Sequence, residues 1–297
     1  MKTGAMALAA PSNRVADFIA LTKPRLNVLV LVTTTVCFYL AAPNADTLWL
    51  IGPTLVGTAL VAGGAAALNQ LYERDADGLM LRTRLRPLPD GRLLPVEAKR
   101  FGLALSLLGL AALAYVRPLA AGLALATLVS YVLVYTPLKS RTWFAMVVGA
   151  VPGALPAALG WTAASGSMTV EAWVLFGIVF LWQIPHFLAI AWIYREDFSR
   201  AGFPLLPIIE PTGRRTARHV LLYLAALIPV SLAPAWVGMA GTPYLIGATF
   251  LGLGLAVLGI RFAWTRCTRN ARGLFAGSII YLLLLWAFLV ATKFFSG

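Results

Sequence analysis

The sequence predicts an all-α protein that crosses a membrane nine times. Of its 297 residues, 60% are hydrophobic and 12% are charged, and the mean hydropathy is +0.83, a balance typical of polytopic membrane proteins. Apolar stretches of roughly 20 residues, the length that spans a bilayer, recur along the chain. Helices are expected because backbone groups in lipid must form their hydrogen bonds within the segment. The expected spans are residues 26–42, 48–71, 98–116, 119–136, 143–163, 171–194, 218–239, 243–263 and 274–294.

The distribution of positive charge predicts the orientation. All Lys and Arg residues except Arg117 and Lys293, 22 of the 24, lie in the N-terminal arm or in alternate loops, at 72–100, 137–142, 195–218 and 261–273. The positive-inside rule places this side and the N-terminus in the cytoplasm and the C-terminus outside, as expected for a bacterial inner membrane. The net charge of +13 is then explained first by the membrane topology and by contact with anionic lipids, and second by binding of a phosphate-bearing substrate. Binding to nucleic acid is not needed to explain it.

The chain is expected to form one domain. Residues 1–22 are predicted to be an N-terminal cytoplasmic arm without a signal peptide, and residues 23–297 a single transmembrane domain. Cys37 is expected near the outer end of the first span and Cys267 in an inner loop, so no disulfide is expected between them.

The first span opens on Thr22-Lys-Pro-Arg-Leu-Asn27, where Pro24 suits a first helical turn. Lys23 and Arg25 have two interpretations at this point. They either anchor the helix at the lipid headgroups or bind a diphosphate or carboxylate.

The second span is rich in small residues between Gly57 and Ala67, which predicts close helix packing, and it leads into a charged stretch. Asn69, Glu73 and Asp77 follow at i, i+4 and i+8, so they share one helical face. Such oxygen ligands suit Mg²⁺ together with substrate phosphates. Arginines that could bind the phosphates follow at 74, 82, 84 and 86. The alternative is a solvated loop whose charges pair with one another.

The next inner loop, Tyr135-Thr-Pro-Leu-Lys-Ser-Arg-Thr142, offers Lys139 and Arg141. They form either a clamp for a phosphate or propionate or a simple membrane anchor. In the fifth span, Pro152 and Pro156 predict a kinked helix that lines a cavity or packs against a neighbour.

The sixth span carries polar residues on one helical face: Gln183, His186, Ile190, Tyr194 and Asp197 follow helical spacing. An intramembrane histidine that leads to an acidic cluster is a candidate for function. The alternative is a structural hydrogen bond.

The second and sixth spans end alike, in Tyr72-Glu-Arg-Asp75 and Tyr194-Arg-Glu-Asp197. This recurrence predicts two four-helix pseudo-repeats plus a ninth helix. Two acidic helix ends on one side of a bundle are then expected to hold cations between them and bridge one diphosphate.

With these motifs in view, the chain resembles the UbiA superfamily of intramembrane prenyltransferases, and within it the protohaem IX farnesyltransferases. The superfamily motif Asn-x₃-Asp-x₃-Asp is similar to Asn69, Glu73 and Asp77, with Glu in the middle. The second motif, Asp-x₃-Asp, departs at Ala201, which leaves the number of metal ions open, with Glu196 as a substitute. Further similar segments are Met80-x-Arg-Thr-x-x-Arg-Pro87, Tyr135-Thr-Pro-Leu-Lys-x-Arg-Thr142, Trp182-Gln-x-Pro-His-Phe187 and Phe203-Pro-Leu-Leu-Pro207.

The resemblance implies a nine-helix bundle that transfers farnesyl from farnesyl diphosphate to the 2-vinyl of haem B, adding water to give haem O. It implies Mg²⁺ bound by the catalytic residues Asn69, Glu73, Asp77 and Asp197, and a downstream haem A synthase as a partner. The expected substrate-binding residues are Lys23, Arg25, Arg82, Arg86, Tyr135, Lys139, Arg141, Gln183, His186 and Tyr194. The alternatives are prenyl transfer to a quinone or another aromatic or tetrapyrrole acceptor, and a transporter.

Overall fold

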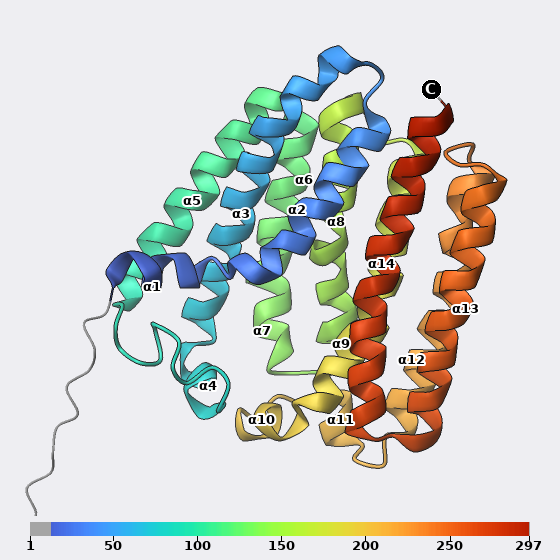
Figure 1. The fold of residues 1–297 in the computed structure, drawn as a ribbon. Coiled ribbons are helices and arrows are strands. Elements are labelled where there is room, and N and C mark those ends of the chain that lie inside the picture. The colour runs from blue at the N-terminus through green and yellow to red at the C-terminus, as the bar shows by residue number, and fades with distance from the viewer. Residues whose placement is uncertain (1–12, 297) are drawn as a thin grey trace, which may run out of the picture.

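The structure is a computed structural model that describes residues 13–296, with side chains to residue 293. Within this part of the chain, all regular structure is helical, and nine helices are long and apolar enough to cross a membrane. They stand side by side in one bundle (Figure 1). The predicted fold class is confirmed.

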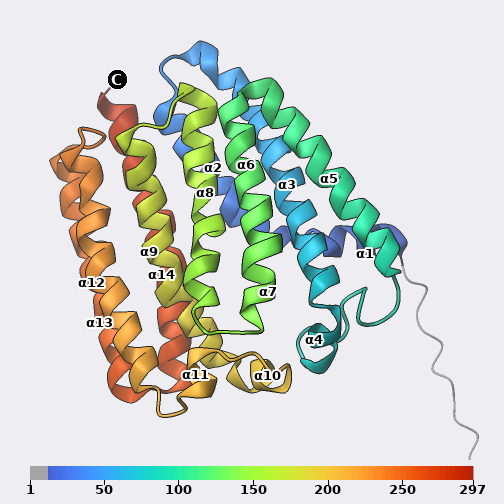
Figure 2. The same ribbon diagram turned by 180° about the vertical axis from the view of Figure 1, so that it is seen from behind.

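Figures 1 and 2 show the spans and the short helices between some of them. The spans are α2 (Pro24–Ala41), η1 with α3 (Ala45–Leu50, Ile51–Tyr72), α5 (Pro95–Val116), α6 with η2 and α7 (Pro118–Val129, Ser130–Tyr135, Thr136–Lys139), α8 (Ala145–Ser165), α9 (Val170–Ile193), α12 (Arg214–Trp236), α13 (Thr242–Thr265) and α14 (Thr268–Ser296). The short helices are α1 (Arg14–Leu21), α4 (Arg74–Leu79), α10 (Arg195–Arg200) and α11 (Leu206–Ile209).

Each predicted span coincides with a helix, and local chemistry sets the boundaries. The boundary at Arg117 shows how one residue separates two spans. Arg117 is extended, with φ −158° and ψ 130°, because the proline that follows disfavours helical geometry in the residue before it. Pro118 then starts α6 as its first residue, where a missing N–H costs nothing.

Helices α3 and α5 pack closely through glycines. A Cβ on Gly64 would lie 2.6 Å from the backbone oxygen of Gly102, and one on Gly109 would lie 2.6 Å from the backbone oxygen of Gly57. Only residues without a side chain allow this approach, so the packing role predicted for the small residues of the second span is confirmed.

One end of the bundle, here called the basic end, carries loops 73–94, 140–144, 194–213 and 266–267, and holds α4, α10 and α11 (Figure 1). The C-terminus lies at the opposite end. Cys37 is buried in α2 and Cys267 is exposed in the turn between α13 and α14, and neither forms a disulfide.

Helix α1 lies across the bundle near the basic end (Figure 1). Leu21 is buried among Ala67, Leu88 and Leu93, and Asp17 forms an ion pair of 3.1 Å with Arg92. Part of the predicted arm is therefore a helix packed on the bundle, whereas residues 1–12 lie outside the described residues. The domain boundary at residue 22 stays a prediction.

The two similar sequence segments adopt the same local structure. Helix α3 ends at Tyr72, Glu73 leaves helical geometry, and the six-residue helix α4 follows. In the same way, α9 ends at Ile193, Tyr194 leaves helical geometry, and the six-residue helix α10 follows. The larger four-span repeat stays a prediction, but this matched pair of helix tips forms the mouth of the site.

Candidate active site

The three polar residues of the first acidic motif lie on one face, as predicted, despite the break between α3 and α4. The N–H of Glu73 donates to the backbone oxygen of Asn69 (2.9 Å), and the N–H of Asp77 donates to that of Glu73 (2.7 Å). These i→i−4 bonds keep helical spacing through the break. Asn69, Glu73 and Asp77 are 2%, 6% and 1% exposed, so oxygen ligands are stacked in a buried position.

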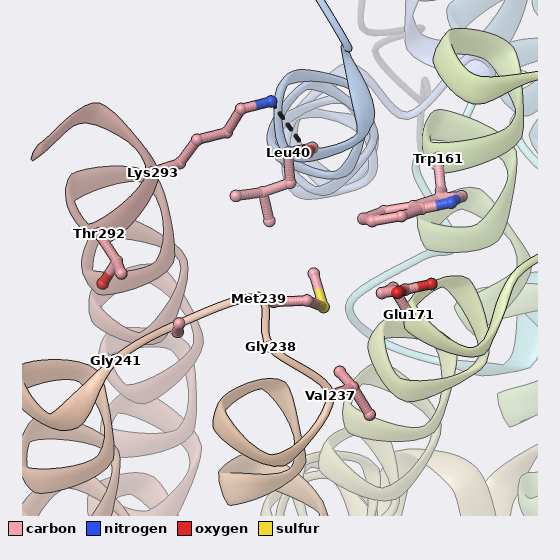
Figure 3. Close-up of a pocket in the computed structure, with 10 residues that line it drawn as sticks. Leu40, Trp161, Glu171, Val237, Gly238, Met239, Gly241, Thr292 and Lys293 are labelled. Carbon is pink, nitrogen blue, oxygen red and sulfur yellow. Dashed lines mark hydrogen bonds between the residues drawn. The ribbon is translucent and has the colours of Figure 1, made fainter. Parts of the chain in front are cut away.

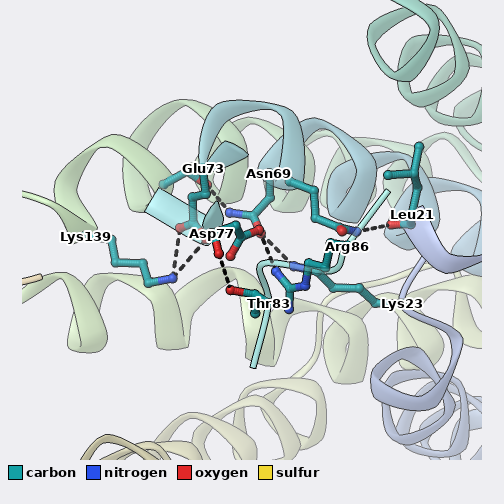
Figure 4. Close-up of polar contacts among 10 residues, drawn as sticks. Leu21, Lys23, Asn69, Glu73, Asp77, Thr83, Arg86 and Lys139 are labelled. Carbon is teal, nitrogen blue, oxygen red and sulfur yellow. Dashed lines mark hydrogen bonds and ion pairs between the residues drawn. The ribbon is translucent and has the colours of Figure 1, made fainter. Parts of the chain in front are cut away.

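Each of these side chains is bonded to a cation, which comes from a distant segment for Asn69 and Glu73 and from the following loop for Asp77 (Figure 4). Lys23 Nζ donates to Asn69 Oδ1 (2.8 Å), and Arg86 pairs with Asp77 (2.7 Å). Lys139 Nζ contacts both carboxylate oxygens of Glu73, at 2.9 and 3.0 Å. The structure thus brings three of the predicted substrate-binding cations onto the three predicted metal ligands.

The alternative of a solvated loop with self-paired charges does not describe this cluster. The partners come from the start of α2, from α7 and from the loop after α4, and the acids are buried. Removing ions from water costs several kcal/mol each, and buried pairs contribute little net stability. A buried charge cluster of this kind is characteristic of functional sites.

The electrostatics of the cluster favour a bound anion. Burial raises the pKa of Glu73, but the charges of Lys139 and Lys23 outweigh it and hold that pKa below its usual value. Burial and the nearby charge of Arg86 lower the pKa of Lys23 to about 8. Burial and Arg86 also lower the pKa of Arg82. The cations are crowded, and a polyanion between them would relieve their repulsion.

The second acidic motif meets the first at this mouth. Asp197 Oδ1 accepts a hydrogen bond from the N–H of Leu81 (3.2 Å) and from Arg200 (2.8 Å). The guanidinium of Arg82 lies 4.7 Å from the ring centre of Phe198 and 5.3 Å from that of Tyr194. The loop that follows α4 is therefore in contact with α10, and this proximity is what a shared diphosphate requires.

The residues present fit a magnesium ion that is completed by substrate. In the part of the chain that the structure describes, no group of three or more His, Cys, Asp and Glu side chains could hold a metal ion. Ala201 supplies no acid and Glu196 is exposed, so Asp197 is the acid of α10 at the mouth. The donors are nevertheless oxygens, and Mg²⁺ ordinarily takes one or two carboxylates plus substrate phosphates and waters. Metal binding by these residues stays a prediction.

Two predicted binding residues lie apart from the cluster. Arg25 and Arg141 are both exposed, and neither has an ion pair within residues 13–293. Of the two interpretations that the sequence allowed, anchoring at the lipid headgroups fits these exposed side chains.

A cavity of about 340 Å³ extends from the cluster into the membrane-spanning part of the bundle. This volume is within the range of small-molecule sites. Its walls are mostly apolar, and among its lining residues are the predicted Lys23, Tyr135, Gln183 and His186 together with Tyr131, Trp182 and Phe187.

The tyrosine wall of the cavity depends on an irregular helix. Residues Ser130–Tyr135 form a π-helical turn, η2, a feature found frequently at functional sites. Tyr131 and Tyr135 line the cavity with ring centres 5.4 Å apart. Gly149 makes room for Tyr135, since a Cβ there would lie 2.5 Å from the Tyr135 ring. Tyr131 was not among the residues predicted from the sequence, although its spacing of four from Tyr135 was a usable signal.

Gln183 and His186 form the polar part of the cavity wall. Gln183 donates to the backbone oxygens of Ala150 (3.2 Å) and Val179 (3.0 Å), and it fits because residue 153 is glycine. His186 Nδ1 lies 2.8 Å from Ser278 Oγ on α14. Ser278 was also not predicted, because no sequence pattern around residue 278 could connect it to residue 186.

A second cavity, of about 620 Å³, lies at the opposite end (Figure 3). Glu171 is its single carboxylate, and Lys293 donates to the backbone oxygens of Tyr39, Leu40 and Ala42 at 2.7, 3.0 and 2.7 Å. It therefore has no counterpart to the cluster of stacked carboxylates and crowded cations that adjoins the first cavity at Lys23, and the candidate active site is that cluster together with the first cavity.

The fold and the site together define an integral membrane enzyme of the intramembrane prenyltransferase class, with a charged mouth above an apolar chamber. The chain belongs to the UbiA prenyltransferase family, whose model matches residues 30–289. The resemblance seen in the sequence motifs is thereby confirmed.

Curated relatives match nearly the whole chain. A protein of Solibacter usitatus is 47% identical over 288 residues, with 93% of this chain and 98% of the relative covered. One of Myxococcus xanthus is 46% identical over 280 residues, with 94% and 95% covered. Both are named protoheme IX farnesyltransferase.

Solved structures share the fold. A UbiA homologue of Aeropyrum pernix has a TM-score of 0.70 at 21% identity, covering 92% of this chain and 98% of the other. A UbiA homologue of Archaeoglobus fulgidus, solved with GPP and Mg²⁺, has a TM-score of 0.64 at 19% identity, covering 93% and 99%. These likenesses agree with the nine-span bundle described above.

Proposed function

We propose that this protein transfers the farnesyl group of farnesyl diphosphate to the 2-vinyl of haem B, with addition of water, giving haem O and diphosphate. The observation that carries the proposal is a buried cluster of carboxylates and cations directly above an apolar cavity with a histidine in its wall. The curated relatives support the same acceptor through their shared name.

The cations at the mouth bind the leaving diphosphate. Glu73 and Asp77 are surrounded by four cations, Lys23, Arg82, Arg86 and Lys139. When a diphosphate enters, these cations exchange their present oxygen partners for phosphate oxygens. Mg²⁺, when bound by Asn69, Glu73, Asp77 and Asp197, supplies further positive charge to the leaving group. Charges fixed in advance around a developing anion lower the barrier to bond cleavage.

The chamber protects the reactive carbon. When the bond from the farnesyl C1 to diphosphate breaks, the terminal vinyl carbon bonds to C1, and water adds to the adjacent carbon with loss of a proton. Tyr131, Tyr135, Trp182 and Phe187 line the space where the allylic cation forms. Aromatic faces stabilise a cation, and the apolar wall excludes water until the carbon–carbon bond has formed.

We also infer that the basic end faces the cytoplasm of a bacterial cell and that the protein lies in its inner membrane. Most of the lysines and arginines lie in the loops at this end or in the helix ends that adjoin them, which supports the inward orientation. Substrate then enters from the cytoplasmic side, and haem O would be available to a downstream haem A synthase.

The test uses proteoliposomes that contain the purified full chain, haem B, farnesyl diphosphate and Mg²⁺. We expect a hydroxyethylfarnesyl haem by mass spectrometry, and we expect removal of Mg²⁺ with EDTA to stop its formation and readdition to restore it. Prenylation of a quinone but not of haem would support the quinone alternative. Transport without release of diphosphate would place the protein among transporters.

A further inference from the structure

The ring of His186 is fixed on several sides within the cavity wall. Trp182 stacks on it with ring centres 4.9 Å apart, and Phe275 of α14 lies 4.9 Å away on a tilted plane. Trp182 Nε1 donates to the backbone oxygen of Ser278 (2.6 Å), which fixes α9 and α14 relative to each other at this level. The histidine therefore has one ring orientation rather than several.

The hydrogen bonds of Ser278 determine which ring nitrogen carries the proton. Ser278 Oγ lies 2.7 Å from the backbone oxygen of Phe275, and a carbonyl oxygen can only accept, so the hydroxyl proton lies on this contact. Ser278 Oγ also lies 2.8 Å from His186 Nδ1. Since the hydroxyl has no second proton, it must accept here, and Nδ1 is the donor.

In this tautomer, the neutral imidazole has an unshared electron pair on Nε2. Nε2 has no hydrogen-bond partner among the side chains and backbone groups that the structure describes, although His186 is only 8% exposed. The ring lines the cavity. Among the described residues, Nε2 is not one of the fully buried side-chain atoms that lack a partner, so it is accessible from the cavity that the ring lines, and a ligand in that cavity can reach its electron pair.

We propose that Ser278 is a positioning residue that holds His186 in this tautomer so that Nε2 coordinates the iron of the porphyrin acceptor. This inference rests on the proposed function, because only a metalloporphyrin acceptor uses the electron pair. Histidine ligands of metals commonly donate their other N–H to a protein oxygen, which fixes ring and tautomer and raises ligand basicity. Ligation holds the macrocycle at one depth, and His186 thereby selects iron porphyrins over quinones.

The experiment compares two porphyrins on the purified full chain: ferric haem B and metal-free protoporphyrin IX. We expect the haem complex to show the absorption and EPR signature of nitrogen ligation. We expect His186→Ala to lose this signature and to bind haem at least tenfold more weakly, with unchanged binding of the metal-free ring. Added imidazole should restore the nitrogen-ligated spectrum of this variant.

The role of Ser278 has its own readout. Ser278→Ala removes the acceptor for Nδ1–H, and loss of such outer-shell partners costs about 10- to 100-fold in metal affinity. In the ferrous complex, the iron–histidine stretching frequency should fall, because the imidazole loses basicity. Ser278→Thr keeps the hydroxyl and should return the frequency toward its original value.

Two results would overturn the inference, and they differ from failure of the proposed function. If His186→Ala weakens both porphyrins equally, or leaves the haem spectrum unchanged, His186 acts only in packing. If the Ser278→Ala frequency is unchanged, Ser278 does not set the tautomer. If the unaltered protein binds neither porphyrin, the proposed function itself fails, and this inference fails with it.

Discussion

Asp77 is the most deeply buried acid of the cluster, and its pairing with Arg86 gives it a strong electrostatic role. The substitution Asp77→Asn keeps the shape of the side chain but removes the negative charge that positions the metal ion and Arg86. We expect turnover to fall by at least about 100-fold, the effect of losing one fixed charge or donor at a reacting centre. Product formation by mass spectrometry measures this.

A matched control is available on the same short helix. Asp75 pairs with Arg74 at the surface, with its side chain 87% exposed, so Asp75→Asn should leave turnover and insertion unchanged. Normal turnover in Asp77→Asn, or an equal loss in both variants, would remove Asp77 from the metal site.

Lys23 gives the site a pH dependence. Its pKa of about 8 means that the free site carries this charge below pH 8 and loses it above. A bound diphosphate favours the protonated amine and raises its pKa, so affinity should fall as pH rises above 8, by up to about tenfold per pH unit. The dissociation constant of a non-hydrolysable farnesyl diphosphate analogue, measured from pH 7 to 9.5, tests this.

Arginine at the same position keeps its charge throughout this range. Lys23→Arg should therefore remove most of the decline above pH 8. Parallel curves for the two proteins would show that another group causes the dependence.

At the scale of elements, the glycine contact between α3 and α5 limits what the bundle tolerates. A Cβ on Gly109 would meet backbone atoms, the oxygen of Gly57 at 2.6 Å and the nitrogen of Val61 at 2.8 Å. Backbone cannot move aside as a side chain can, so Gly109→Ala should destabilise the protein by about 1–3 kcal/mol. Unfolding of the detergent-solubilised protein measures the change.

Gly122 in α6 provides the comparison, since a Cβ there would have no atom within 4 Å. Gly122→Ala should be neutral or slightly stabilising, because alanine is the better helix former. If both variants unfold alike, the close approach of α3 and α5 is not a constraint on stability.

The helical period explains why part of the site could be predicted. Asn69, Glu73 and Asp77 share a face whatever the tertiary fold, and hydrogen bonds carry that spacing through the break at Glu73. Their partners could not be predicted in this way, because Lys139 lies 66 positions from Glu73. Nor could spacing separate Lys23, which enters the cluster, from Arg25, two positions further on, which stays exposed.

Element types were predictable and element ends less so. Nine spans follow from apolar length, but the segment that forms α1 was expected to be part of the N-terminal arm and not a helix. Its position depends on contacts with distant residues, such as the ion pair of Asp17 with Arg92. The π-helical turn at Ser130–Tyr135 likewise has no signature in apolar periodicity.

At the scale of the whole molecule, the native cysteines report orientation. Cys267 is exposed at the basic end and Cys37 is fully buried. A membrane-impermeant maleimide should therefore label the protein in inside-out vesicles and not in intact spheroplasts. Cys267→Ser should abolish labelling, and labelling of spheroplasts would reverse the proposed topology.

The contact between His186 and Ser278 joins residues 92 positions apart, on α9 and on the last span that the structure describes. A ribosome makes α9 well before α14, so the growing chain already holds its histidine in the bilayer while the serine is still untranslated. The wall of the chamber is completed only when this late helix has been inserted. A chain that ends before α14 is therefore expected to lack the haem ligation proposed for His186.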